Sequence, residues 1–183
     1  MKKALLLTFV LTLFIITGCG NQNETTKTDT LNNAKTIENV EKETKNELYF
    51  KDNEAKLNDL KIKITETKVI QVGEPGNKYG KKPVLAIWYE TTNLSDKDIN
   101  PTSAWMVLFK AVQDNNPNAV NKLEVGMLPD EQFLDSQLET IKKDGTVKNA
   151  IAYELDDLIT PVTLIATQGI DGHKLGEQTY NLK

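Results

Sequence analysis

A series of short, β-forming runs separated by turn residues constrains the fold of this chain most strongly. Residues 61–70 begin by alternating polar and apolar side chains, and residues 84–91 are almost continuously apolar. Runs of this kind, bounded by Gly, Pro, Asn and Asp, are typical of strands. They predict strands at 61–70, 84–91, 105–112, 147–154, 161–167 and 175–182. Six short strands without a βαβ rhythm predict an all-β fold, an antiparallel β-sandwich.

Residues 117–142 interrupt this strand pattern. The run Pro129-Asp130-Glu131-Gln132 is typical of a helix start with Asp130 as the N-cap. Apolar residues then follow at spacings of four and three, at Leu134, Leu138 and Ile141. We therefore expect a short helix or an ordered loop to be inserted between the strands.

The first nineteen residues have the pattern of an export signal. A basic start at Met1-Lys2-Lys3 is followed by an apolar run from Ala4 to Ile16. This run is too short to span a membrane, which takes about 20 residues, and it suits a secretory signal peptide. The tetrapeptide Ile16-Thr17-Gly18-Cys19 resembles a bacterial lipobox, at which the cysteine is lipidated and becomes the new N-terminus. It implies cleavage between Gly18 and Cys19; the alternative is a cleaved signal with an incidental cysteine.

Cys19 is the only cysteine of the chain. Each buried methylene of a lipid contributes about 0.8 kcal/mol, so two or more acyl chains on Cys19 would hold the protein on a membrane. We predict a lipid anchor on the extracytoplasmic face of the bacterial cell membrane. No cysteine then remains for a disulfide, and the folded part has to depend on its hydrophobic core.

The sequence predicts three segments. Residues 1–18 are the lipoprotein signal peptide, residues 19–47 a polar flexible linker, and residues 48–183 a single β-sandwich domain. The linker has low hydrophobicity and high charge, which is typical of disorder. As a coil of about 27 residues it would span roughly 30 Å. A frayed helix within the linker is the alternative, because apolar residues recur every three positions from Leu31 to Val40.

The charge of the chain argues against a nucleic-acid partner. The formal net charge is −4, and removal of Lys2 and Lys3 with the signal peptide lowers it to −6. All basic residues are lysines, and arginine is absent. Proteins that bind nucleic acids do so through basic patches and bidentate arginine contacts. We therefore expect no binding to nucleic acid.

Two parts of the chain resemble a known family. Residues 82–97 are similar to the strand-and-turn signature of Gram-positive lipoproteins that carry one immunoglobulin-like domain of unknown function. Residues 141–147, followed by 151–155, resemble a later signature of that family, in which a charged glycine turn leads into a strand. The resemblance covers residues 48–183 and implies an immunoglobulin-like β-sandwich on the outer face of a membrane. It implies no catalytic residue.

No pattern in the sequence indicates catalytic or metal chemistry. His173 is the only histidine and follows Gly172 in an expected turn, away from any pairing that a triad or zinc site needs. Residues 73–82 lack the spacing of a phosphate loop, and residues 96–100 lack the length of a calcium loop. We predict no catalytic residue, no metal and no cofactor, and a protein that is not an enzyme.

Trp88 and Glu90 form the candidate interaction surface. On an extended strand, Leu85, Ile87 and Tyr89 share one face, whereas Trp88 and Glu90 share the other. If the first set packs in the core, Trp88 lies on the outer face, where an exposed tryptophan can anchor a partner. The alternative is that Trp88 belongs to the core or is covered by the long 117–142 stretch.

The leading hypothesis is a membrane-anchored extracytoplasmic lipoprotein that acts as a non-enzymatic binding module. A protein or cell-wall component is the expected partner, besides the membrane itself through Cys19. Two other hypotheses remain: a surface carrier for a small ligand or ion, and an envelope hydrolase with paired carboxylates, whose geometry depends on the fold. The sequence predicts neither a particular partner nor an oligomeric state.

Overall fold

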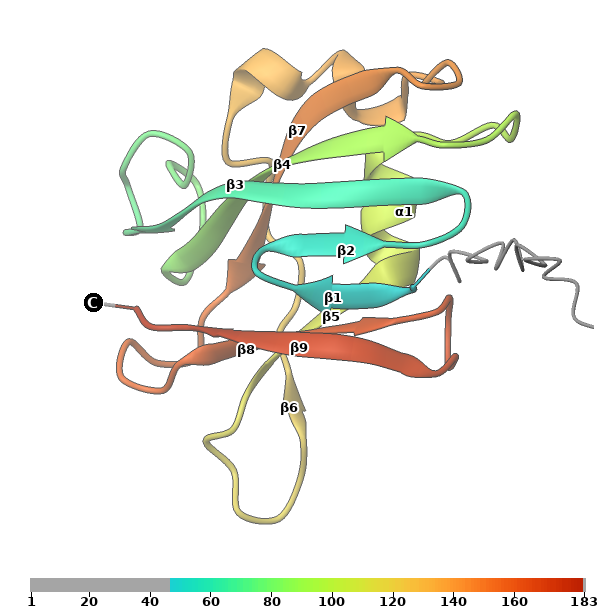
Figure 1. Ribbon diagram of the computed structural model, residues 1–183. Helices are drawn as coiled ribbons and strands as arrows, with labels where there is room; N and C mark the ends of the chain where they lie inside the picture. Colours follow the sequence, from blue (N-terminus) through green and yellow to red (C-terminus); the bar gives the residue numbers. More distant parts are fainter. Residues whose placement is uncertain (1–46, 183) are drawn as a thin grey trace, which may run out of the picture. The chain divides into compact units, whose positions relative to one another are not determined.

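Two antiparallel β-sheets build the folded part of the protein (Figure 1). The computed structural model describes residues 47–182. One sheet has five strands in the order β1-β2-β3-β4-β7: β1 (Tyr49–Lys51), β2 (Glu54–Lys56), β3 (Leu60–Ile70), β4 (Val84–Asn93) and β7 (Thr146–Glu154). The other has four in the order β6-β5-β8-β9: β5 (Phe109–Gln113), β6 (Asn121–Lys122), β8 (Val162–Thr167) and β9 (Lys174–Tyr180). The predicted all-β antiparallel sandwich is confirmed.

The core lies between the sheets and consists of the side chains of alternate residues of the strands. Leu85, Ile87 and Tyr89 of β4 are almost fully buried in the main hydrophobic cluster. Tyr89 stacks at 4.4 Å on Trp105, whose indole N–H donates to the Tyr153 hydroxyl at 2.8 Å. Burial raises the pKa of Tyr153 to about 12. The buried indole N–H thus has the hydrogen-bond partner that it requires.

The strand predicted at 105–112 is wrong in its first half. Residues Pro101–Leu108 form the helix α1, and only Phe109–Gln113 form the strand β5. The Asn100 side chain accepts a hydrogen bond from the backbone N–H of Ser103, and Pro101 occupies the first helical turn. Both are typical of a helix start. Pro101, Ala104, Trp105 and Leu108 are buried at helical spacing, so tertiary packing outweighs the β propensity of this run.

Residues 117–142 contain the short strand β6 and, after it, an ordered loop with two short 3-10 turns, η1 (Glu131–Phe133) and η2 (Ser136–Leu138). Asp130 caps η1 as expected, because its carboxylate accepts from the backbone N–H of Gln132. A continuous helix does not form. Of the three apolar residues at helical spacing, Leu134 and Leu138 are exposed and only Ile141 is buried.

A β-bulge changes the alternation of β3. Ile64 pairs with Tyr89, and the next paired residue, Glu66, lies opposite Trp88, so Thr65 is the extra residue. Before the bulge Ile62 and Ile64 face the core, and after it Glu66 faces outward. The bulge thus allows one strand of eleven residues to keep its charged side chains on the outer face.

The hairpin of β1 and β2 and the short β6 were not predicted. The hairpin turns at Asp52 and Asn53, which both have positive φ angles, of 49° and 62°. The strand β1 of this hairpin contacts β9 of the other sheet. A Cβ on Gly176 of β9 would lie only 2.1 Å from the carbonyl oxygen of Phe50 in β1. Only a glycine at this position permits so close an approach.

The predicted signal peptide, Cys19 and most of the predicted linker lie outside the described residues. Within the described part, no helix is long and apolar enough to cross a membrane.

Candidate functional site

The side chains of β4 alternate between two environments. Leu85, Ile87 and Tyr89 belong to the main core, whereas Trp88 and Glu90 are half-buried on the opposite face of the five-stranded sheet. Glu90 lies 3.7 Å from the ammonium group of Lys148 on the neighbouring strand β7. The structure therefore brings Trp88 and Glu90 to one outer surface.

A second, smaller hydrophobic cluster lies on this outer surface. Trp88 packs against it, and its buried members are Ile70, Val84, Ala86 and Ala152. Two stretches of chain cover it: the loop between β3 and β4, residues 71–83, and the segment 126–133 of the long insertion. Trp88 is therefore covered by part of the 117–142 stretch, which was one of the alternatives that the sequence left open.

The two covering stretches touch each other through their backbones. A Cβ on Gly76, where φ is +90°, would lie 2.5 Å from the carbonyl oxygen of Pro129. Gly126 lies close over the sheet, with the position of its Cβ 3.4 Å from Val84. Its backbone N–H donates to the Ala152 carbonyl of β7 at 2.9 Å. Glycine at position 76 therefore lets the backbone of one stretch lie against the backbone of the other.

Asp130 fastens the segment 126–133 to the sheet. Its carboxylate accepts the indole N–H of Trp88 at 2.9 Å and the backbone N–H of Gln132 at 3.2 Å. Partial burial disfavours the charged carboxylate, but these hydrogen bonds outweigh it and hold the pKa of Asp130 below its usual range. Asp130 is thus ionised and bound within the protein at neutral pH.

Asn77 shapes the loop 71–83 from inside. Its side chain is almost fully buried, and its amide donates to the carbonyls of Ile70 at 3.2 Å and Lys82 at 2.9 Å. These bonds tie the end of β3 to the start of β4. Residues 71–83 therefore form a hairpin loop, because β3 and β4 are antiparallel neighbours.

A cleft of about 640 Å³ lies between the loop 71–83 and the segment 127–131. Tyr79 and Met127, which are 73% and 58% exposed, supply its aromatic and apolar surface. Lys78 and Glu131 add opposite charges to its lining. Its volume falls within the range of small-molecule pockets, about 300–1,000 Å³, and its mixed lining allows apolar contact together with charged hydrogen bonds.

A second groove, of about 240 Å³, lies beside Trp88. It is lined by Trp88, Glu90 and Lys148 from the sheet and by Gln132 and Phe133 from η1. Asp130 itself lines the larger cleft. The Trp88–Asp130 hydrogen bond therefore links one lining residue of each hollow, and the predicted surface of Trp88 and Glu90 lines the smaller one.

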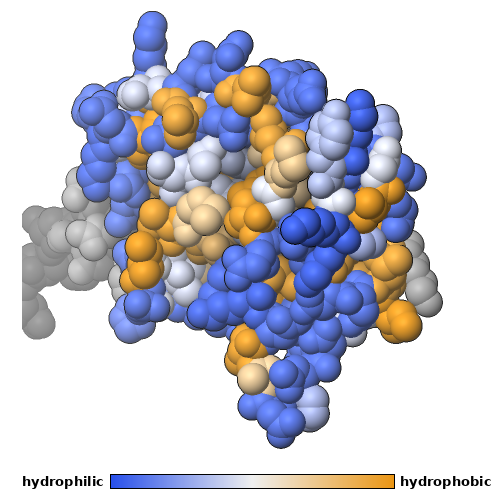
Figure 2. Space-filling view, turned by 180° about the vertical axis from the view of Figure 1, so that it is seen from behind, coloured by the Kyte–Doolittle hydropathy of each residue, from blue (hydrophilic) through white to orange (hydrophobic). Residues whose placement is uncertain are grey.

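Exposed apolar side chains continue from the cleft onto the helix. Met127 borders a small cavity of about 80 Å³ together with Met106 of α1, which is 50% exposed. The view from behind Figure 1 shows several patches of hydrophobic side chains among hydrophilic ones on this face (Figure 2). The apolar rim of the cleft thus belongs to a broader surface.

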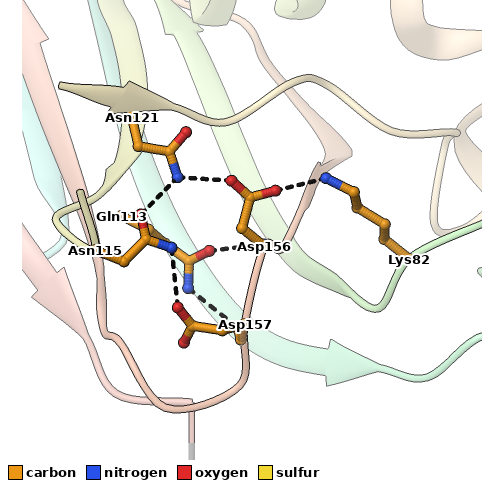
Figure 3. A network of polar contacts seen from close by, with 6 residues as sticks. All are labelled: Lys82, Gln113, Asn115, Asn121, Asp156 and Asp157. Carbon is orange, nitrogen blue, oxygen red and sulfur yellow. Dashed lines mark hydrogen bonds and ion pairs between the residues drawn. The ribbon is translucent and has the colours of Figure 1, made fainter. Parts of the chain in front are cut away.

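A network of polar side chains fixes the far end of the loop 71–83 (Figure 3). Lys82 forms an ion pair with Asp156, whose other oxygen accepts from Asn121 at 2.7 Å. Gln113 is fully buried and donates to the carbonyl oxygens of Asp157 and Thr160. The Lys82 and Asn121 contacts lower the pKa of Asp156. These groups satisfy one another, so the network positions loops.

The remaining sequence candidates do not join the site. His173 is exposed in the loop between β8 and β9, and Asp96 and Asp98 are exposed in the turn after β4. Asp96 pairs with Lys143 at 3.0 Å. Among residues 47–182, no group of three or more His, Cys, Asp or Glu side chains is placed to hold a metal ion.

The fold and the site together define a two-sheet β-sandwich domain with a loop-lined cleft beside one sheet. Residues 23–168, well over half of the chain, match the family model described as "Domain of unknown function (DUF5067)", and the chain belongs to this family.

Two solved structures share the fold. One is a candidate lipoprotein from Staphylococcus aureus subsp. aureus NCTC 8325, with 23% identity and a TM-score of 0.63 over 74% of this chain and 92% of that one. The other is a protein from Enterococcus faecalis, with 18% identity and a TM-score of 0.55 over 74% of this chain and 93% of that one. The comparison with curated proteins finds no match.

Proposed function

We propose that this protein is a lipoprotein held at the extracytoplasmic face of the bacterial membrane by lipid on Cys19. Its immunoglobulin-like sandwich domain acts as a non-enzymatic binding module for a protein or cell-wall component. The lipobox supports the anchor. The similarity of the fold to that of a candidate lipoprotein from a Gram-positive bacterium agrees with this proposal.

The observation that carries the binding role is the cleft beneath Tyr79 and Met127. Its walls are held in place by Asn77, by the contact of Gly76 with Pro129 and by the Trp88–Asp130 bond. A rigid cleft with an exposed aromatic residue loses little entropy when it binds, which favours recognition. Tyrosine and methionine are also enriched at protein interfaces.

The state of the carboxylates favours binding over hydrolysis. A general acid needs a raised pKa, whereas the pKa of Asp130 is lowered and its oxygens accept structural hydrogen bonds. Glu131, the other carboxylate of the cleft, is exposed to solvent. Neither residue is in the environment that paired-carboxylate catalysis uses.

The anchor is tested by Cys19→Ser in the full chain, produced in a Gram-positive host fed with a labelled fatty acid. We expect the wild-type protein to incorporate the label and to sediment with membranes, and the variant to do neither. Thr17→Ser, which keeps the cysteine, serves as the matched control. Equal labelling of the wild-type protein and the Cys19→Ser variant would contradict the anchor.

The binding role is tested by a photo-crosslinking amino acid placed at Tyr79 in the anchored protein. The control position is Ile170, which is 78% exposed in the β8–β9 loop at the opposite end of the domain (Figure 1). We expect discrete adducts at position 79 and none at position 170. The absence of adducts at 79, or the same adducts at both positions, would refute the proposal.

The volume of the cleft favours one alternative, a carrier for a small ligand. This role predicts a thermal shift when envelope metabolites or metal ions are added to the protein, and adducts of small mass at position 79. Flat melting curves would remove the alternative and leave the protein or cell-wall partner.

A further inference from the structure

The outer face of the five-stranded sheet concentrates lysine. The register places Glu54, Lys63, Glu90 and Lys148 side by side across four strands, β2, β3, β4 and β7. Alternation along the same strands adds further outward lysines. The part of this face that the segment 126–133 leaves open, here called the lysine face, carries six lysines and three glutamates: Lys51, Lys56, Lys61, Lys63, Lys68, Lys148, Glu54, Glu66 and Glu90.

The charge of the lysine face is opposite to that of the remaining domain. The rest of residues 47–182 contains nine lysines and eighteen acidic residues, including Glu154, which lies on the covered end of the same sheet face. The protein as a whole has a net charge of −4. A positive face on a negative domain orients the molecule in an external field.

Most of these lysines are free to meet a partner. Lys61 pairs with Glu54 at 3.6 Å, and Lys148 pairs with Glu90 at 3.7 Å. The other four lysines of the face have no acidic partner within 4.0 Å among residues 47–182, and three of them are exposed. β1, β2 and β3 lie in front of α1 in Figure 1, so this face points away from the core.

The chemistry of the face fits a flat array of anions. Lysine ammonium groups are compact charges that attract phosphate without bidentate geometry, and each contributes to attraction toward an anionic bilayer. The strand β1, at which the described residues begin, is the edge strand of this sheet. The chain that leads back to Cys19 therefore joins the domain beside the lysine face.

We propose that the lysine face docks on the headgroups of anionic phospholipids in the membrane that carries the anchor. The inference rests on the anchoring part of the proposed function, because a tether supplies the high local concentration that a weak electrostatic contact needs.

The test measures lysine reactivity in the full lipidated protein. The protein is purified from producing cells and reconstituted into vesicles of phosphatidylcholine, alone or with about one third phosphatidylglycerol. A water-soluble acetylating reagent modifies exposed lysines, and mass spectrometry gives the rate at each position. We expect Lys56, Lys63 and Lys68 to react several-fold more slowly on anionic vesicles, and Lys110 and Lys122 of the other sheet to be unchanged. High salt should abolish the difference.

Charge reversal provides the matched comparison. Lys63→Glu with Lys68→Glu should weaken docking by more than about 25-fold, since the loss of each lysine alone costs roughly fivefold and each new glutamate adds repulsion, and it should remove the protection of Lys51 and Lys56. Lys110→Glu with Lys122→Glu changes the net charge equally and should leave the protection intact. All four residues are exposed, and Lys63→Gln with Lys68→Gln repeats the test with a smaller change.

Separate outcomes refute the docking and the anchor. If the protein stays with both kinds of vesicle but its lysines react equally on each, the lysine face does not dock and the anchor stands. If the protein leaves phosphatidylcholine vesicles, the anchor fails. If soluble polyphosphate protects the same lysines on phosphatidylcholine vesicles, the occupant is an anionic polymer and the lipid proposal is overturned.

Discussion

We predict that the hydrogen bond between Trp88 and Asp130 stabilises the packing of the segment 126–133 on the sheet. Trp88→Phe removes the indole N–H that donates at 2.9 Å and keeps most of the aromatic packing against Ala86 and Ala152. A hydrogen bond to a charged group contributes about 1.5–3 kcal/mol when buried. Because both residues are only partly buried, we expect a loss near the lower end, about 1–1.5 kcal/mol including lost contact area.

A double-mutant cycle with Asp130→Ala isolates this bond. Urea unfolding of the wild-type protein, the two single variants and the double variant should give a coupling free energy of about 1 kcal/mol. Leu134→Ala, at an exposed position of the same insertion, serves as control and should change the free energy of unfolding by less than about 0.5 kcal/mol.

The coupling should depend on pH with a defined sign. The folded-state pKa of Asp130 is lowered, so its stabilising contribution is present above the unfolded pKa of about 3.9 and is lost as the pH falls through the folded value. We therefore expect constant coupling at neutral pH and a decrease below about pH 4. A coupling near zero at pH 7, or one that grows in acid, would refute this account of the fastening.

Two further variants test the frame around the site. Gln113→Ala leaves two carbonyls and one amide of the partly buried β7–β8 loop without their partner and should cost about 2 kcal/mol in urea unfolding. Asn115→Ala at the exposed edge of the same network should cost less than about 0.5 kcal/mol. Gly176→Ala places a Cβ against the Phe50 carbonyl and should cost more than about 3 kcal/mol or prevent folding. Gly73→Ala, at φ +90° in open space, should cost only about 1 kcal/mol and shows what the backbone alone contributes.

The architecture was predictable because the strands of the five-stranded sheet carry their pattern locally. The apolar run of β4 and the alternating start of β3 can be recognised in the sequence. The two strands pair over nearly their whole lengths. The helix α1 was missed because Trp105 and its neighbours are β-forming residues. Its start, Asn100-Pro101, is nevertheless a local signal for an N-cap followed by a first-turn proline, and it marks the helix correctly.

The site was only partly predictable. Alternation along β4 places the side chains of Trp88 and Tyr89 on opposite faces of the sheet. Nothing in the sequence of β4 indicates that residues 126–133 cover Trp88. The cleft residues Tyr79 and Met127 were missed for the same reason, since a pocket between two loops depends on contacts distant in sequence. The local signals available were Gly76 and Gly126, which mark the places where one backbone lies on another.

The β-bulge at Thr65 determines which side chains of β3 face the core and which face outward. With strict alternation after Ile64, Glu66 and Lys68 would point into the core and Val69 would point to solvent, which would bury two charges. The bulge shifts the alternation by one residue, so that Glu66 lies outward beside Trp88 and Lys68 lies outward beside Ala86. The lysine face therefore continues along the whole of β3 while Val69 packs against the main core. The same sheet presents small alanines at its β4–β7 end, where the segment 126–133 can lie close, and charged side chains at its β1–β3 end, where burial would be costly.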